Sequence, residues 1–242
     1  WLEEQGMLDE AIHHARESGD LEMVARLMEK GLKDVLNRED HLTLEQWIRL
    51  LPEGYLHSRP SLLMIKVWAL GVTWHLGAMM KVLHQVEALI EAGKATLDTD
   101  TVQVLRGQIA TVHSLDSYFH NQPVRTLEYC REGLALLPQS WTYARGLIML
   151  FLGLSMQASG QGQVAERLLF DQYESRDDKT DGFAMRLLLP LCFNYLTNGN
   201  LEQSRQVANI MIEQATRSNL PVMKGWGHYF IGLVKYQWNE MD

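Results

Sequence analysis

Turn-forming residues recur at almost constant spacing through the C-terminal half of the chain, and this regularity limits the possible folds more than any other feature. Subtracting successive residue numbers gives steps of 39, 39 and 40 residues between the turn centres Asn121, Gly160, Gly199 and Asn239. Mostly small residues lie seven positions before each turn and five positions after the first three: Ser114, Gly153, Cys192, Gly232, Thr126, Ala165 and Ser204. Small side chains on both arms let two helices approach closely across a short polar turn, so each unit is predicted to be a helical hairpin.

A fixed period of this length predicts a stacked array of helical hairpins. The composition agrees, because the good helix formers Leu, Ala, Met, Glu and Gln dominate and runs rich in Val, Ile and Thr are missing. We therefore expect an all-α protein, a right-handed superhelix of antiparallel helix pairs that forms a TPR-like solenoid with a period of about 39–40 residues. Such arrays present surfaces and seldom carry chemistry in their repeats.

Apolar periodicity, caps and breaks place the individual helices. The C-terminal ones are expected at 99–118, 123–136, 141–158, 162–175, 182–197, 201–217 and 222–237, with Pro190 kinking or interrupting one of them. The N-terminal ones are expected at 7–17, 20–30, 32–37, 43–51, 60–75 and 78–92, with Thr43 as a cap and Gly77 as a turn. Residues 54–96 then form an irregular leading repeat, and residues 97–242 form TPR-like repeats that are truncated at the C-terminus.

The charge and cysteine content exclude several classes of protein. The net charge is -8 and the 22 Lys and Arg form no basic stripe, so the footprint of nucleic-acid binding is missing. No apolar run reaches the ~18 residues of a membrane span, and no signal peptide is visible, so a cytoplasmic location is expected. Cys130 and Cys192 lie in apolar helical runs and are predicted to be buried thiols.

Motifs for chemistry are weak or missing. The segment around Gly93 and Lys94 lacks the first glycine of a phosphate-binding loop, and Gly93 is better explained as a helix C-cap. No two histidines lie four residues apart as a helical metal site requires, since His13 and His14 are adjacent. No nucleophile elbow or Cys-x-x-Cys occurs. We expect no enzyme activity, cofactor or metal in this chain.

The positive prediction is a binding surface. If the first helix of each pair lines a concave face, counting back from each turn selects an apolar and aromatic set with a few polar groups, as in ligand sites. The candidate ligand- or partner-binding residues are Tyr118, Gln157, Arg186, Phe193, Trp226 and Tyr229. The alternative is that such side chains fill the core or pack against a further helix, as is expected for Leu233 and Tyr236. On the binding hypothesis, Arg186→Ala weakens binding without unfolding the chain.

The N-terminal residues carry a family resemblance. The string from Trp1 to Ala15, followed by Leu44-Glu45-Gln46-Trp47-Ile48-Arg49-Leu50-Leu51-Pro52, Arg59-Pro60-Ser61-Leu62 and Trp68-Ala69-Leu70, resembles the stretch that joins the ATPase module to the helical repeats of MalT-like regulators. These are large LuxR-type, ATP-dependent transcriptional activators of bacteria. The resemblance covers about residues 1–75, and beyond them only a generic helical repeat is shared.

The resemblance implies that residues 1–53 are a helical linker region following an ATPase module, within a longer polypeptide. Trp1 to Glu4 resemble a helix end and Trp238 to Asp242 a turn without its second helix, which agrees with a piece of a larger protein. In such a parent protein ATP and DNA would be bound by modules outside this chain. This arm would bind a small-molecule inducer or a regulatory protein and control self-association. The alternatives are a protein-docking TPR scaffold without a small ligand and a helical appendage of an enzyme.

Overall fold

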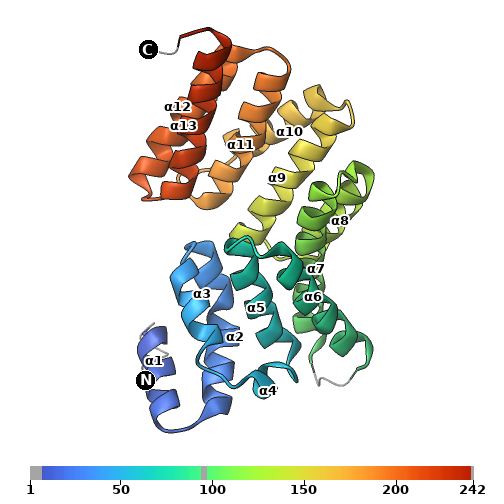
Figure 1. Cartoon of the computed structure of the whole chain (residues 1–242), viewed down its shortest axis with the longest axis vertical. Coiled ribbons are helices and arrows are strands. Elements are labelled where there is room, and N and C mark those ends of the chain that lie inside the picture. The colour runs from blue at the N-terminus through green and yellow to red at the C-terminus, as the bar shows by residue number, and fades with distance from the viewer. Residues whose placement is uncertain (1–6, 94–96, 241–242) are drawn as a thin grey trace. The chain divides into compact units, whose positions relative to one another are not determined.

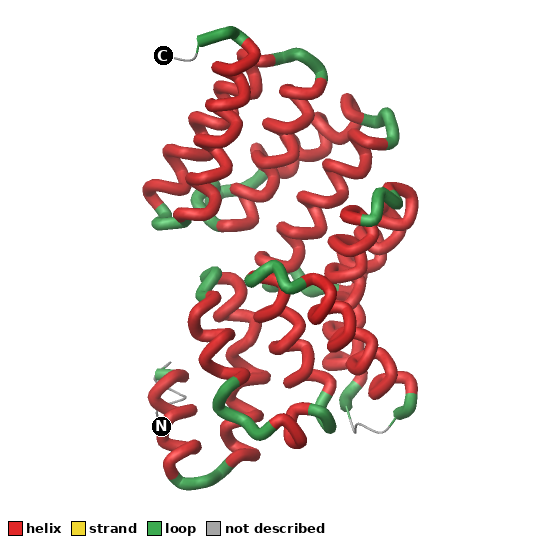
Figure 2. The backbone as a smooth tube through the Cα atoms, viewed as in Figure 1, coloured by secondary structure: helices red, strands yellow, loops and turns green. Residues whose placement is uncertain are grey.

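The computed structural model describes residues 7–93 and 97–240, and this described part holds thirteen helices and no strand (Figures 1 and 2). In chain order they are α1 (Leu8–Glu17), α2 (Leu21–Asn37), α3 (His41–Ile48), α4 (Glu53–Leu56), α5 (Pro60–Val72), α6 (Leu76–Glu91), α7 (Thr99–Phe119), α8 (Pro123–Leu136), α9 (Thr142–Ala158), α10 (Gly162–Glu174), α11 (Gly182–Thr197), α12 (Leu201–Arg217) and α13 (Pro221–Gln237). The predicted all-α helical-repeat fold is confirmed.

The chain divides into two compact units, Trp1–Ile109 and Ala110–Asp242, and the division falls within α7. The predicted start of the regular repeats, residue 97, lies just before this helix. The helix end expected at Trp1 to Glu4 lies outside the described residues, as do Lys94 and Asp242. Within the described part, no helix is long and apolar enough to cross a membrane.

The turns of the second unit confirm the periodic pattern. Asn121, Gly160, Gly199 and Asn239 have φ angles of 55°, 74°, 76° and 59°, which is the left-handed conformation that Gly and Asn adopt most readily. The small residues are buried on both arms, as the hairpin model requires. Ser204 Oγ on α12 donates a hydrogen bond to the Cys192 carbonyl on α11 over 3.0 Å, so the two backbones lie in close contact.

Pro190 does not interrupt α11, contrary to the prediction. The helix runs through it because its ring packs over Gly153 of α9. A Cβ placed on Gly153 would lie 3.0 Å from Pro190 Cβ. A proline in a helix costs a backbone hydrogen bond, and the close contact that this glycine allows contributes to the packing between the two helices.

Three local expectations in the first unit were wrong. α2 continues through Gly31, where a break was predicted, because this glycine makes room for Leu8 and Trp47. Asp40, and not Thr43, caps α3, and its carboxylate accepts hydrogen bonds from both the amide and the hydroxyl of Thr43.

The third difference concerns the turn before α6. The left-handed residue there is Trp74, with φ 59°, and Gly77 lies inside the helix. A tryptophan in this conformation breaks the preference for Gly and Asn, so composition pointed to the wrong position.

The motif residues behind the family resemblance form much of the core of the first unit. Leu44, Trp47, Leu62 and Trp68 are all buried, and α5 packs against α2, α3 and α6. Trp68 Nε1 donates a 2.7 Å hydrogen bond to Gln108 Oε1, which satisfies two buried polar groups at once. These residues therefore have a structural role in this unit.

Candidate functional site

The six predicted binding residues lie at several places in the second unit. Tyr118 ends α7, Gln157 ends α9, Arg186 and Phe193 belong to α11, and Trp226 and Tyr229 belong to α13. Of these, Trp226 and Tyr229 are in direct contact, with ring centroids 5.6 Å apart in an edge-to-face arrangement. The structure thus gives each residue its own surroundings, and their shared role in binding stays a prediction.

Arg186 is buried in the contact between α9 and α11, with 3% of its surface exposed. Its guanidinium lies over the ring of Tyr143 at 4.4 Å, and its Nη1 donates a 2.9 Å hydrogen bond to the Gly182 carbonyl. The aliphatic part of the side chain lies over Gly146, where an added Cβ would come within 3.0 Å of Arg186 Cδ. This position favours the packing alternative for Arg186, because its stacked side chain bridges two helices.

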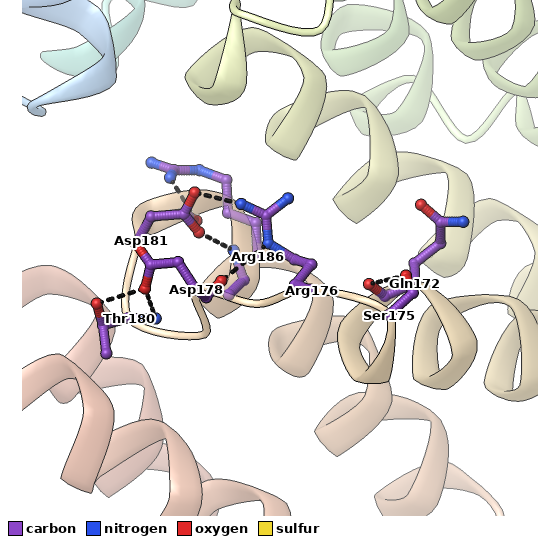
Figure 3. Close-up of polar contacts among 9 residues, drawn as sticks. Gln172, Ser175, Arg176, Asp178, Thr180, Asp181 and Arg186 are labelled. Carbon is purple, nitrogen blue, oxygen red and sulfur yellow. Dashed lines mark hydrogen bonds and ion pairs between the residues drawn. The ribbon is translucent and has the colours of Figure 1, made fainter.

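The loop before α11 is held by its own polar groups, as Figure 3 shows. Arg176 pairs with the Asp181 carboxylate at 2.5 Å, and Asp181 also caps α11 by accepting a 2.8 Å hydrogen bond from the Ala184 amide. Asp178 accepts hydrogen bonds from the hydroxyl and amide of Thr180, which lower its pKa. The carboxylates of this polar loop are therefore engaged in shaping the connection between α10 and α11.

Gln157 and Tyr118 occupy the turn ends of their helices. Gln157 Nε2 donates to Thr197 Oγ1 over 2.8 Å, which links the C-terminal ends of α9 and α11. Tyr118 is half-buried beside Phe151, with ring centroids 5.3 Å apart, and burial raises the pKa of its hydroxyl. Both residues retain accessible surface.

The most exposed aromatic surface is on α13. Trp226 and Tyr229 are 37% and 53% exposed, and Tyr236 is 65% exposed. Val222 is also exposed, at the start of the same helix. Sequence analysis missed Val222 and assigned Tyr236 to packing, although their spacing of seven residues on either side of Tyr229 places all three on one face of the helix. That spacing was the signal available in the sequence.

The buried cysteines offer no reactive thiol. Desolvation raises the pKa of Cys130 to about 12 and also raises the pKa of Cys192, so both remain protonated at neutral pH. Among residues 7–93 and 97–240, no group of three or more His, Cys, Asp or Glu side chains could hold a metal ion.

A charged cluster in the first unit joins α2, α4 and the start of α5. Tyr55 donates a 2.5 Å hydrogen bond to Glu22, and the Arg59 guanidinium pairs with the same carboxylate. The two hydrogen bonds lower the pKa of Glu22, whereas burial raises the pKa of nearby Glu29. The cluster connects three elements around the Arg59-Pro60 motif, and such a network positions helices.

The accessible features of the second unit are thus apolar and aromatic, and its charged groups are paired within the polar loop. This arrangement can bind an apolar or aromatic surface, since aromatic side chains supply large contact areas with polar edges. It contains no paired nucleophile and base of the kind used in covalent catalysis among the residues described above.

Comparison with known proteins gives a distant relationship. No family model matches the chain, and no solved structure matches it. The chain is similar to the HTH-type transcriptional regulator MalT of Yersinia enterocolitica, with 24% identity over 136 residues. The match covers 56% of this chain and 15% of that regulator. The chain is therefore a helical-repeat protein with distant similarity to a MalT-type transcriptional regulator.

Proposed function

We propose that this chain is the sensor and interaction arm of an ATP-dependent, LuxR-type transcriptional activator. In this proposal the arm binds a small-molecule inducer or a regulatory protein, and binding controls self-association of the parent protein. It performs no catalysis and holds no cofactor, while ATP and DNA are bound by other modules of the parent protein in the cytoplasm.

The observation that supports the proposal best is the similarity to MalT in a chain whose repeats leave aromatic side chains exposed. The similarity points to the class of regulator. The exposed rings of Phe193 on α11 and of Trp226 and Tyr229 on α13 supply surface suited to a sugar or an aromatic compound. An inducer acts by binding one state of the arm more tightly than another, and only this difference in affinity shifts the equilibrium.

The test is a melting-temperature screen of the 242-residue chain against sugars, amino acids, nucleotides and aromatic acids. A true ligand stabilises the folded chain by RT ln(1 + [L]/Kd), so the melting temperature rises with ligand concentration. The same titration on Phe193→Ala, with Val164→Ala on α10 as an equally exposed control, identifies the surface involved. A flat response to every compound contradicts ligand sensing.

A second function, a protein-docking scaffold without a small ligand, is favoured by the continuous aromatic stripe on α13. Helix faces with exposed aromatic rings are common anchors at protein interfaces. A flat ligand screen together with specific binding of a regulatory protein would establish this alternative. Sequencing the parent gene on both sides separates the two, because a phosphate-binding loop upstream and a helix-turn-helix downstream belong to the regulator alone.

A further inference from the structure

One face of α13 is uncovered along the whole helix. Val222, Gly225, Tyr229, Gly232 and Tyr236 recur at intervals of three and four residues and so lie in one stripe. All five are exposed, and nothing lies within 4 Å of a Cβ added to either glycine. Trp226 and Leu233 stand along one edge of these residues. We call these seven residues the α13 stripe.

The same face of α9 is used for helix packing. Gly146 and Gly153 precede Gly225 and Gly232 by 79 residues each, which is two steps of the repeat. In α9 both glycines are covered by α11: the Phe183 backbone and Arg186 lie over Gly146, and Pro190 lies over Gly153. The α13 stripe is therefore at a position where this fold receives a helix.

The α13 stripe is complementary to itself. Trp226 and Gly232 lie three residues before and after Tyr229, Gly225 and Leu233 lie four residues before and after, and Val222 and Tyr236 lie seven. In an antiparallel pair whose two-fold axis passes through Tyr229, each residue faces the one equally far on the other side in the second copy. Each large side chain, Trp226 or Leu233, then meets a glycine.

The charges permit this pairing. The seven residues of the stripe are uncharged, so two copies meet without like charges at the axis, although the chain carries a net charge of -8. The cations of α13, Lys224 and Lys235, are five and six residues from Tyr229 and point about 140° and 120° away around the helix. Repulsion between the two chains is long-range and falls as salt is added.

The size of the stripe sets the strength of the contact. α13 has 17 residues, which corresponds to a length of about 25 Å. One helix face of this length covers less than the ~800 Å² per partner of a standard interface. The contact is therefore weak and reversible, as suits an equilibrium that a ligand or a neighbouring module can shift.

We infer that the α13 stripe binds the same stripe of a second copy of this chain, as an antiparallel helix pair with its two-fold axis at Tyr229. The inference extends the proposed control of self-association by naming its surface and geometry. It is tested without ligand, so it can fail while the ligand screen succeeds, and the reverse can also occur.

The test uses the two-fold axis, at which a residue meets its own copy. Tyr229→Cys brings two thiols together, and mild oxidation of the 242-residue chain should give a disulfide-linked dimer on a non-reducing gel. The native Cys130 and Cys192 are buried and contribute no background. Val164→Cys, on the exposed face of α10, is the control. Tyr229→Cys is expected to cross-link several-fold faster, and equal rates would overturn the inference.

A second pair of variants separates specific docking from chance collisions. In the Tyr229→Cys background, Gly232→Glu places two carboxylates in the paired face and should reduce cross-linking to the level of Val164→Cys. Gly77→Glu is the matched control, because Gly77 is also exposed, helical and without neighbours within 4 Å of an added Cβ. Both variants keep the fold, since each replaces an open helical glycine. Cross-linking that survives Gly232→Glu would show that another surface joins the copies.

Discussion

α9 and α13 present the same face in two states. In α9 the face is filled, because α11 lies over Gly146 and Gly153. In α13 the equivalent Gly225 and Gly232 have open space above them. The residue type is the same at both positions of both helices, so the glycines alone do not reveal whether a helix is packed above them. What differs is the neighbour, and the consequences of substitution differ with it.

The sharpest test of this comparison is a large side chain in the filled face. Gly153→Leu should destabilise the chain by about 1–3 kcal/mol, the typical cost of overpacking. The added Cβ would lie 2.8 Å from Leu169 Cδ1 and 3.0 Å from Pro190 Cβ. Urea denaturation measures the loss. Gly232→Leu is the counterpart in the open face and should leave the midpoint unchanged or raise it; equal losses in the two variants would contradict the comparison.

The next effect concerns Arg186, which fills the space between α9 and α11. Arg186→Ala should lower stability by about 2 kcal/mol, because a desolvated stack on Tyr143 and the packing of the aliphatic chain are both lost. Arg186→Met keeps most of the packing and should lose less. An unchanged melting temperature, together with weaker ligand binding in the screen above, would instead support the binding role predicted from the sequence.

A smaller effect separates the two glycines near the helix starts. Gly225→Ala should stabilise α13 by about 0.5–1 kcal/mol, because alanine loses less backbone freedom in a helix. Gly146→Ala should lose this gain, since its Cβ would lie 3.3 Å from the Phe183 Cα and 3.0 Å from Arg186 Cδ. Thermal unfolding of the two variants is sufficient. A gain at Gly146 equal to that at Gly225 would mean that α11 yields easily.

The smallest effect on stability is expected from the thiols, which report on access. Cys192 occupies in α11 the register position of Gly153 and Gly232, and burial raises its pKa. Because a raised folded pKa stabilises the folded state below the unfolded pKa of about 8.5, this contribution is lost as the pH rises further. Iodoacetamide at pH 8 should leave native Cys192 unmodified while labelling Gly232→Cys. Rapid labelling of the wild-type chain would show that α11 opens.

The sequence was sufficient to predict the period, the turns and most helix bounds, because Gly and Asn mark left-handed turns by their backbone preference. It failed at Gly31 and Pro190, where a tertiary contact stabilises a residue that local rules exclude from a helix. It failed at Trp74 because a bulky residue takes the left-handed conformation. Tertiary packing overrides propensity at each of these positions.

The candidate site was less predictable. Counting from the turns selected residues on the correct helices, but the template cannot distinguish a buried Arg186 from an exposed Tyr229. That distinction depends on whether a neighbouring helix covers the position. The exposed stripe of α13 was nevertheless present in the spacing of Val222, Tyr229 and Tyr236.

Packing between helices that are close in the chain also determines how fast the second unit can fold. α8 packs on α9, α9 on α10 and α11, and α12 on α13, so most contacts join segments within one or two repeat steps. Closing such short loops costs little entropy, and folds of this kind cross their barrier within microseconds to milliseconds. A hairpin can also form before its neighbours. The chain can therefore begin to fold as soon as one hairpin leaves the ribosome, without waiting for distant segments.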